Sequence, residues 1–135
     1  KPDAMEISEC SVPASLTAIA LDSAPSLRES RRILLIAATM AVNEQTVFNN
    51  DRFDVEIDFG VFPLLYRSGR FSLTLANRSA NAPEVYALNL DGSRFAEVPL
   101  TIQNGRTRLT LRTACRGNVI AAYEVIQTEK GDHPQ

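Results

Sequence analysis

Alternating hydrophobic and polar positions recur along the chain and predict short β-strands. Residues 53–59 show the pattern most clearly, because every second side chain there is apolar and the residues between are acidic. A period of two is typical of a strand that buries one face and exposes the other. Residues 70–75 alternate in the same way, and residues 16–21 form a short, largely apolar strand.

One segment is apolar almost without interruption. Residues 31–38 consist of two arginines followed by six apolar residues, which predicts a strand buried on both faces. A helix over residues 26–40 competes with this strand, because periodicity does not separate a short buried strand from a buried helix. The apolar run is far too short to cross a bilayer.

The second half of the chain predicts an antiparallel meander. Asp91-Gly92 and Asn104-Gly105 stand between apolar runs, and such dipeptides favour hairpin turns because both central positions of a type I′ turn need positive φ. Pro99 cannot donate a hydrogen bond to a neighbouring strand, so its strand is expected at a sheet edge or bulged there. The strands predicted around these turns cover residues 84–90, 94–102, 106–111 and 119–126.

Eight or nine short strands and no strong helix pattern indicate an all-β fold. We expect an antiparallel β-sandwich of the immunoglobulin-like or jelly-roll-like kind. The length of 135 residues fits one domain, which we place at residues 15–127. Residues 1–14 are then an N-terminal extension or linker, and residues 128–135 a polar tail that holds the single histidine, His133.

Composition narrows the classes of partner. The chain has 14 Lys and Arg against 16 Asp and Glu, a formal charge of −2. This balance argues against a nucleic acid or an anionic membrane as partner. Hydrophobic residues make up 44% and charged residues 22%, which are values of an ordinary globular protein.

Two cysteines lie far apart in the sequence, at Cys10 and Cys115. The spacing excludes CxxC redox and zinc motifs, and with His133 in the tail no Cys/His metal site can be assembled, so no cofactor is expected. Three interpretations stay open, namely two buried thiols, two unrelated surface thiols, or one long-range disulfide in an exported protein.

Several segments together resemble a known kind of domain. The chain looks like the C-terminal β-sandwich accessory domain of bacterial glycoside hydrolase-like proteins over about residues 15–127. The resemblance implies a non-catalytic domain, covalently linked to a catalytic domain in a larger protein that is secreted or periplasmic. Residues 42–48 depart from it, since they contain neither the Gly nor the Trp that such domains often carry. The segments that carry it are Arg31-Arg32-Ile33-Leu34-Leu35-Ile36-Ala37-Ala38, Pro63-Leu64-Leu65, Val85-Tyr86-Ala87-Leu88-Asn89-Leu90-Asp91-Gly92-Ser93-Arg94, Glu97-Val98-Pro99-Leu100 and Ala121-Ala122-Tyr123-Glu124-Val125.

Two charged rows are candidates for chemistry. Asp54, Glu56 and Asp58 would share one strand face about 6–7 Å apart, a spacing that could serve glycoside hydrolysis or contribute to a Ca²⁺ site. A solvated strand face explains the acidic row more simply, so no catalytic or metal residue is assigned. Arg106, Arg108 and Arg112 share a face of another strand and could lie opposite the acidic row.

Aromatic side chains near loops are the candidates for ligand binding, because a flat ring can stack on a sugar. Phe48, Phe62 and Tyr66 fall nearest to loops, and the polar residues Asn49, Asn50 and Asp51 could hydrogen-bond a glycan. Docking onto a neighbouring domain is the preferred role for these rings. The sequence therefore predicts an accessory domain that supports or docks on a catalytic domain. The alternatives are a carbohydrate-binding module for a polysaccharide, or an immunoglobulin-like adhesion or interaction domain.

Overall fold

The computed structural model describes residues 4–77 and 81–127, and within these residues every regular element is a β-strand. A four-stranded sheet has the order β1-β8-β12-β11, and a five-stranded sheet has the order β10-β9-β15-β3-β2, with all neighbours antiparallel. Three two-stranded ribbons complete the described chain. The strands are β1 (Met5–Cys10), β2 (Ser15–Ala20), β3 (Arg32–Ala38), β4 (Ala41–Glu44), β5 (Val47–Phe48), β6 (Glu56–Asp58), β7 (Val61–Tyr66), β8 (Arg70–Ala76), β9 (Glu84–Leu88), β10 (Arg94–Glu97), β11 (Leu100–Gln103), β12 (Arg106–Arg112), β13 (Ala114–Cys115), β14 (Asn118–Val119) and β15 (Ala122–Ile126).

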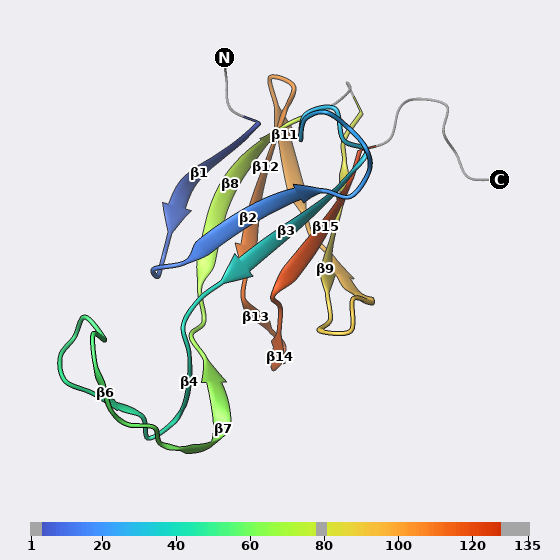
Figure 1. Cartoon of the computed structure of the whole chain (residues 1–135). Coiled ribbons are helices and arrows are strands. Elements are labelled where there is room, and N and C mark those ends of the chain that lie inside the picture. Colours follow the sequence, from blue (N-terminus) through green and yellow to red (C-terminus); the bar gives the residue numbers. More distant parts are fainter. Residues whose placement is uncertain (1–3, 78–80, 128–135) are drawn as a thin grey trace.

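The two larger sheets lie face to face, so the predicted all-β antiparallel sandwich is confirmed (Figure 1). In this view β2 and β3 cross in front of β8 and β12. The strands are more numerous and shorter than the eight or nine expected. Residues 5–10, expected to be part of an extension or linker, instead form β1 and pair with β8. The predicted polar tail, residues 128–135, lies outside the described residues.

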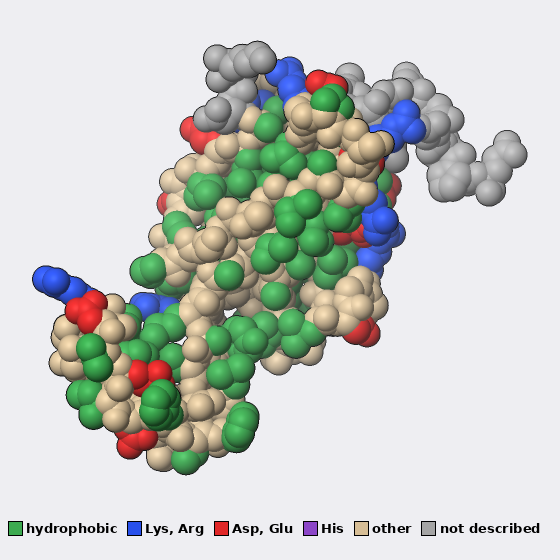
Figure 2. Space-filling view, in the orientation of Figure 1, with side chains coloured by type: hydrophobic (Ala, Val, Ile, Leu, Met, Phe, Trp, Pro, Cys, Tyr) green, Lys and Arg blue, Asp and Glu red, His purple; other side chains and the backbone are tan. Residues whose placement is uncertain are grey.

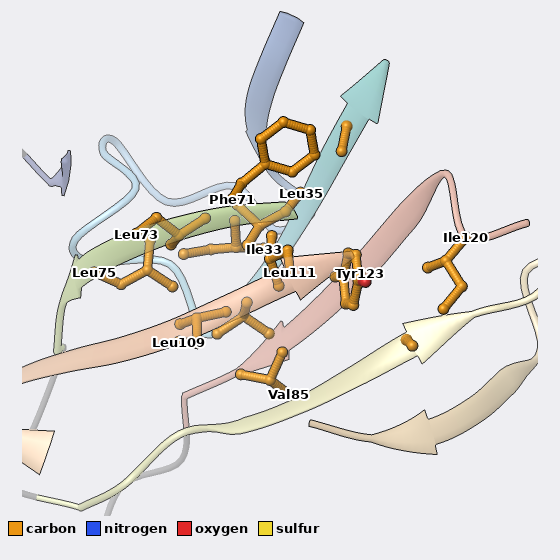
Figure 3. Close-up of a cluster of buried hydrophobic side chains, with 13 residues drawn as sticks. Ile33, Leu35, Phe71, Leu73, Leu75, Val85, Leu109, Leu111, Ile120 and Tyr123 are labelled. Atoms are coloured by element: carbon orange, nitrogen blue, oxygen red, sulfur yellow. The ribbon is translucent and has the colours of Figure 1, made fainter. Parts of the chain in front are cut away.

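The core fills the space between the sheets. Along β8 and β12 every second side chain is buried, and Phe71 and Leu111 have no exposed surface. The opposing sheet contributes the inward side chains of β3, β9 and β15, including Val125, which is also fully buried. Figure 3 shows these side chains converging from both sheets. The period of two in the sequence thus becomes two interlocked apolar faces.

Both predicted hairpins are present. Asn104 and Gly105 have φ of 52° and 69°, and their neighbours Gln103 and Arg106 pair across the turn, as a two-residue type I′ hairpin requires. The turn at Asp91-Gly92 is wider, because β9 ends at Leu88 and β10 begins at Arg94.

The predicted strand over residues 94–102 is divided between the two sheets. The Val98 N–H donates to the Val85 carbonyl at 2.7 Å, whereas Leu100 pairs with Leu109 in the other sheet. The chain therefore changes sheets at Pro99, which has no N–H to offer either of them. Both flanking strands, β10 and β11, are edge strands, as expected from the proline.

The competing helix over residues 26–40 does not form. Residues 32–38 form β3, in which Ile33, Leu35 and Ala37 face the core and the side chains between them face outward. The outward side chains are only partly covered, so the expectation of burial on both faces holds for one face alone. The preceding loop is held by Asp22, whose carboxylate accepts hydrogen bonds from Ser30 Oγ and the Arg31 N–H.

Residues 41–66 leave the sandwich as a separate projection, which we call the arm (Figure 1). Its strands pair only with each other, β4 with β7 and β5 with β6. The predicted half-buried strand over residues 53–59 lies here, and this expectation is wrong in two respects. Only Glu56–Asp58 are in strand conformation, and the apolar side chains of 53–59 are exposed, up to 71% for Phe59. The alternating pattern has no covering layer within the described chain.

The core predicts a stability difference. Leu111→Ala removes a fully buried side chain that both sheets surround, and we expect it to lower the free energy of unfolding by about 2–5 kcal/mol. Leu90→Ala is the matched control, because Leu90 is 73% exposed, and should change stability by less than about 0.5 kcal/mol. Urea unfolding of the two variants measures both values, and equal midpoints would contradict this core.

Candidate functional site

The arm is attached to the sandwich through two adjacent chain segments. The Arg67 N–H donates to the Met40 carbonyl at 2.8 Å, and Thr39 Oγ1 donates to the Arg67 carbonyl at 2.6 Å. Gly69 comes two residues after Arg67, directly before β8, and a Cβ there would come within 2.6 Å of Val12 Cγ2 and 2.9 Å of Phe71 Cζ. Gly69 is therefore closely packed against the sandwich next to the place where the chain returns from the arm.

The arm carries most of the exposed hydrophobic surface. Ten of the fifteen large hydrophobic side chains that are exposed among the described residues belong to it, although the arm is only about a fifth of the chain. Ten side chains of roughly 150 Å² each, about half exposed, present on the order of 800 Å² of apolar surface. A soluble monomer seldom exposes this much, so such a surface marks a place of contact. The ten are Val47, Phe53, Val55, Ile57, Phe59, Val61, Phe62, Leu64, Leu65 and Tyr66.

These side chains cover both faces of the arm. In β7 each residue from Val61 to Tyr66 is exposed, and successive side chains of a strand point to opposite faces. Figure 2 shows hydrophobic atoms over the side of the arm that faces the viewer. A flat surface would cover only one face of such a ribbon, whereas a groove or two flanking surfaces would cover both.

The ligand-binding candidates from the sequence all lie in the arm. Phe48 packs edge-on against Phe53, with ring centroids 5.0 Å apart, so its ring holds the arm together. Asn49 Oδ1 accepts the Val55 N–H, and the Asn50 side chain contacts the Arg52 N–H and the Asp54 carboxylate. These amides shape the loop at the end of the arm, and their polar groups are largely used within it.

Phe62 and Tyr66 are the free aromatic candidates. Phe62 is 87% exposed and Tyr66 46%, and both lie on β7. Asp51 is exposed at the end of the arm. Two well-formed hollows among the described residues are lined by residues outside the arm, and none of the six candidates lines either of them.

The acidic row also lies in the arm and is solvated. Asp58 accepts the Gly60 N–H at 3.0 Å, and Asp54 accepts from the Asn50 amide at 3.0 Å, which are local turn contacts. Among the described residues no group of three or more His, Cys, Asp and Glu is placed to hold a metal ion. The predicted possibility that this row faces the arginines of β12 is wrong, because β12 lies in the sandwich.

The outer face of the five-stranded sheet is also partly apolar. Ile19 on β2 lies opposite Leu34 on β3, and Thr17 lies opposite Ile36, with these side chains on the face turned away from the core. Ala122 of β15 extends the row beyond Ile36. Figure 2 shows green atoms on this face as well as on the arm.

A buried carboxylate in the same face was not predicted from the sequence. Glu124 is in β15, its side chain is only 5% exposed, and Arg32 Nε and Arg94 Nε donate to its two oxygens at 2.5 and 2.9 Å. The Arg94 guanidinium also lies 4.2 Å from the centre of the Tyr86 ring. The sequence alone does not reveal this cluster, because its members are up to 92 residues apart. They come together only when the strands that pair with β15 are known.

The electrostatics of the cluster favour the charged carboxylate. Burial by itself raises the pKa of Glu124, but the hydrogen bonds and charges of Arg94 and Arg32 outweigh it and bring the pKa below its ordinary range. The Tyr86 hydroxyl donates to Glu84 at 2.8 Å, and this bond is the main cause that raises the pKa of Tyr86.

The two cysteines are free thiols in the structure. Cys10 is exposed at the end of β1, where its thiol donates to the Val12 carbonyl, and Cys115 is partly buried against the core. Their pairing in an oxidising compartment stays a prediction, which thiol titration of the exported protein would decide.

None of the protein-family models, curated proteins or solved structures compared with the chain matches it. Within residues 4–77 and 81–127, no helix is long and apolar enough to span a membrane. The candidate site is therefore defined by its own geometry, as an exposed apolar arm beside a partly apolar sheet face.

The Glu124 cluster predicts a pH-dependent contribution to stability. Because the pKa of Glu124 is lowered on folding, the contribution is present above its ordinary pKa near 4.5 and is lost as the pH falls through the folded-state value. Glu124→Gln should lower the free energy of unfolding at pH 7 by about 1–2 kcal/mol, since both arginines are half exposed and regain water. The difference between Glu124→Gln and the unmodified chain should shrink below pH 4.5. Denaturant unfolding from pH 3 to 7 measures it, and a difference independent of pH would refute the ionic explanation.

Proposed function

We propose that the chain is a non-catalytic accessory domain that docks through its arm onto a neighbouring catalytic domain. The observation that supports this is the exposed apolar surface of the arm, which has no covering layer in the described chain. Its area, on the order of 800 Å², is about what one partner contributes to an interface of standard size. The domain in contact would be covalently linked, within a larger secreted or periplasmic protein of the glycoside hydrolase-like kind that the sequence resembles.

The chemistry of the arm favours a protein surface over a sugar. Most of its exposed apolar side chains are aliphatic, such as Ile57, Val61 and Leu65, and they lack the flat rings on which sugars stack. Phe48 is engaged with Phe53, which leaves Phe59, Phe62 and Tyr66 as free aromatic side chains, against six exposed aliphatic ones. Since both faces of the arm are apolar, we propose that it enters a groove in the neighbouring domain rather than resting on a flat surface.

The sheet face beside the arm would complete the contact. Ile19, Leu34 and Ile36 offer a second apolar area on the face that is turned toward the viewer with the arm in Figure 2. The Arg32 and Arg94 guanidinium groups border this area and use only their Nε atoms on Glu124. Their remaining N–H groups are available to acidic side chains at the rim of such an interface.

The alternatives make different demands on the arm. A carbohydrate-binding module would use Phe62 and Tyr66 together with Asn49, Asn50 and Asp51, and would bind a polysaccharide as an isolated chain. An immunoglobulin-like adhesion domain would bind a separate protein. The docking proposal requires contact within the full-length gene product.

Docking is tested by comparing amide hydrogen exchange in the full-length gene product with that in the isolated chain. Amides of residues 53–66 should exchange slowly in the full-length protein and at least tenfold faster in the isolated chain, because the arm is buried only in the former. Phe59→Ser with Phe62→Ser should abolish the difference, whereas the matched control Leu90→Ser with Ile102→Ser, exposed positions outside the arm, should retain it. Equal exchange of the arm in both proteins would refute the proposal.

We also expect the isolated chain to have no glycosidase activity. Hydrolysis normally needs two carboxyl groups in distinct environments, and Asp54, Glu56 and Asp58 are all exposed. Incubation with polysaccharides and chromogenic glycosides should yield no product. The triple variant Asp54→Asn, Glu56→Gln and Asp58→Asn should keep the fold, and turnover that disappears in this variant would overturn the non-catalytic assignment.

A further inference from the structure

A second surface, outside the arm, has a concentration of arginines. On the outer face of the four-stranded sheet, Arg70 of β8 lies directly opposite Arg112 of β12, and Arg108 follows four residues earlier on β12. All three are exposed. Side chains directly opposite each other in an antiparallel pair have Cβ atoms about 4.5–5.5 Å apart, so Arg70 and Arg112 are like charges in contact range.

These arginines are not held in ion pairs within the described chain, although the Glu9 carboxylate lies on the same sheet face, 3.4 Å from Ser72 Oγ. Among the described residues, Arg70, Arg108 and Arg112 form no ion pair, in contrast to Arg32 and Arg94, which share Glu124. Like charges directly opposite on a sheet are destabilising, so the pair costs stability without an anion beside it. An anion bound between the two guanidinium groups would relieve this repulsion.

Two hollows meet at the Arg70 and Arg112 pair. A groove of about 800 Å³ runs beside β12, and a smaller hollow of about 260 Å³ is lined by the same two arginines with Ser11 and Ser68. About half of the residues that line the larger groove are apolar, and it reaches the core side chains Leu73, Leu109 and Tyr123. The rest of its lining is rich in neutral donors and acceptors, and Glu9 and Glu97 are its acidic members. The neutral polar side chains are Ser8, Ser72, Thr101, Gln103 and Thr110.

We propose that this groove binds an acidic saccharide, with the Arg70 and Arg112 pair holding its carboxylate or sulfate. Guanidinium groups bind such oxyanions through paired N–H donors, and the hydroxyl and amide groups of the groove match the hydroxyls of a sugar. Arg108 lies roughly 13–14 Å from Arg112 along the strand, far enough to meet a second anionic sugar of the same chain.

The lining argues against a denser polyanion. Glu9 and Glu97 would repel a continuous row of phosphates, and the chain as a whole carries a charge of −2, so nucleic acid does not fit. A saccharide with charges at intervals can place neutral hydroxyls next to these carboxylates. The groove lies outside the arm, so its ligand would not compete for the arm.

Calorimetric titration of the chain at low salt with trigalacturonate tests the proposal, and inorganic sulfate and neutral cellotriose separate the contributions of charge and sugar. Trigalacturonate should bind saturably, sulfate should bind more weakly and compete, and cellotriose should not bind. Arg70→Gln with Arg112→Gln should weaken trigalacturonate binding at least tenfold. Arg28→Gln with Arg52→Gln, exposed arginines that do not line the groove, makes the same change in net charge and should leave affinity within twofold.

The same variants also show whether the substitutions disturb folding, and further ligands show whether binding is specific for a saccharide. The Arg70 and Arg112 double variant should unfold at the same temperature as the unmodified chain or higher, because it removes a like-charge pair. Absence of saturable binding of both trigalacturonate and a sulfated trisaccharide would overturn the proposal. Equal loss in the control variant, or equal affinity for polyglutamate, would also overturn it by showing attraction to negative charge alone. Each of these results is independent of the hydrogen exchange of the arm.

Discussion

The interlocking of two apolar sheet faces is the interaction on which the remaining structure depends. Phe71 and Leu111 from one sheet and Val125 from the other are fully enclosed, and their burial requires both sheets to be present at once. The hairpins and the crossing at Pro99 only connect strands whose positions this packing sets. The arm and the exposed arginines of β8 and β12 lie outside it, so each can be altered without removing a core side chain.

Much of the sandwich can be predicted from the sequence, because the signals are local. The turn at Asn104-Gly105 and the strand containing Ile33 and Leu35 follow from residue types within a few positions of each other. Other features depend on distant partners. Residues 94–102 divide at Pro99 because the two halves pair with different sheets. The strand β1 is not predicted, because its alternating run is short and its pairing partner β8 is distant in the sequence.

The candidate site shows the limit of periodicity most clearly. Alternation in residues 53–59 predicts a strand with a buried face, and the structure leaves that face exposed. Hydrophobic alternation indicates that one face of a strand is suited to burial, but it does not identify the surface that covers this face. Likewise, the shared face of Arg108 and Arg112 was predicted, whereas the opposite position of Arg70 required the register between β8 and β12. To place Glu124 between Arg32 and Arg94, the register of four strands, β3, β15, β9 and β10, was required.

The joint at Thr39, Met40 and Arg67 makes the arm an insertion between two strand ends of a finished sandwich. Both chain segments leave and return at one place, so neither sheet loses a strand when the arm changes in length or sequence. Substitutions, insertions and deletions in the arm therefore leave the core packing of the sandwich unchanged. If the arm docks as proposed, the same sandwich would fit differently shaped neighbours through replacement of one continuous stretch of about 26 residues, while the close packing of Gly69 against Val12 and Phe71 stayed unchanged.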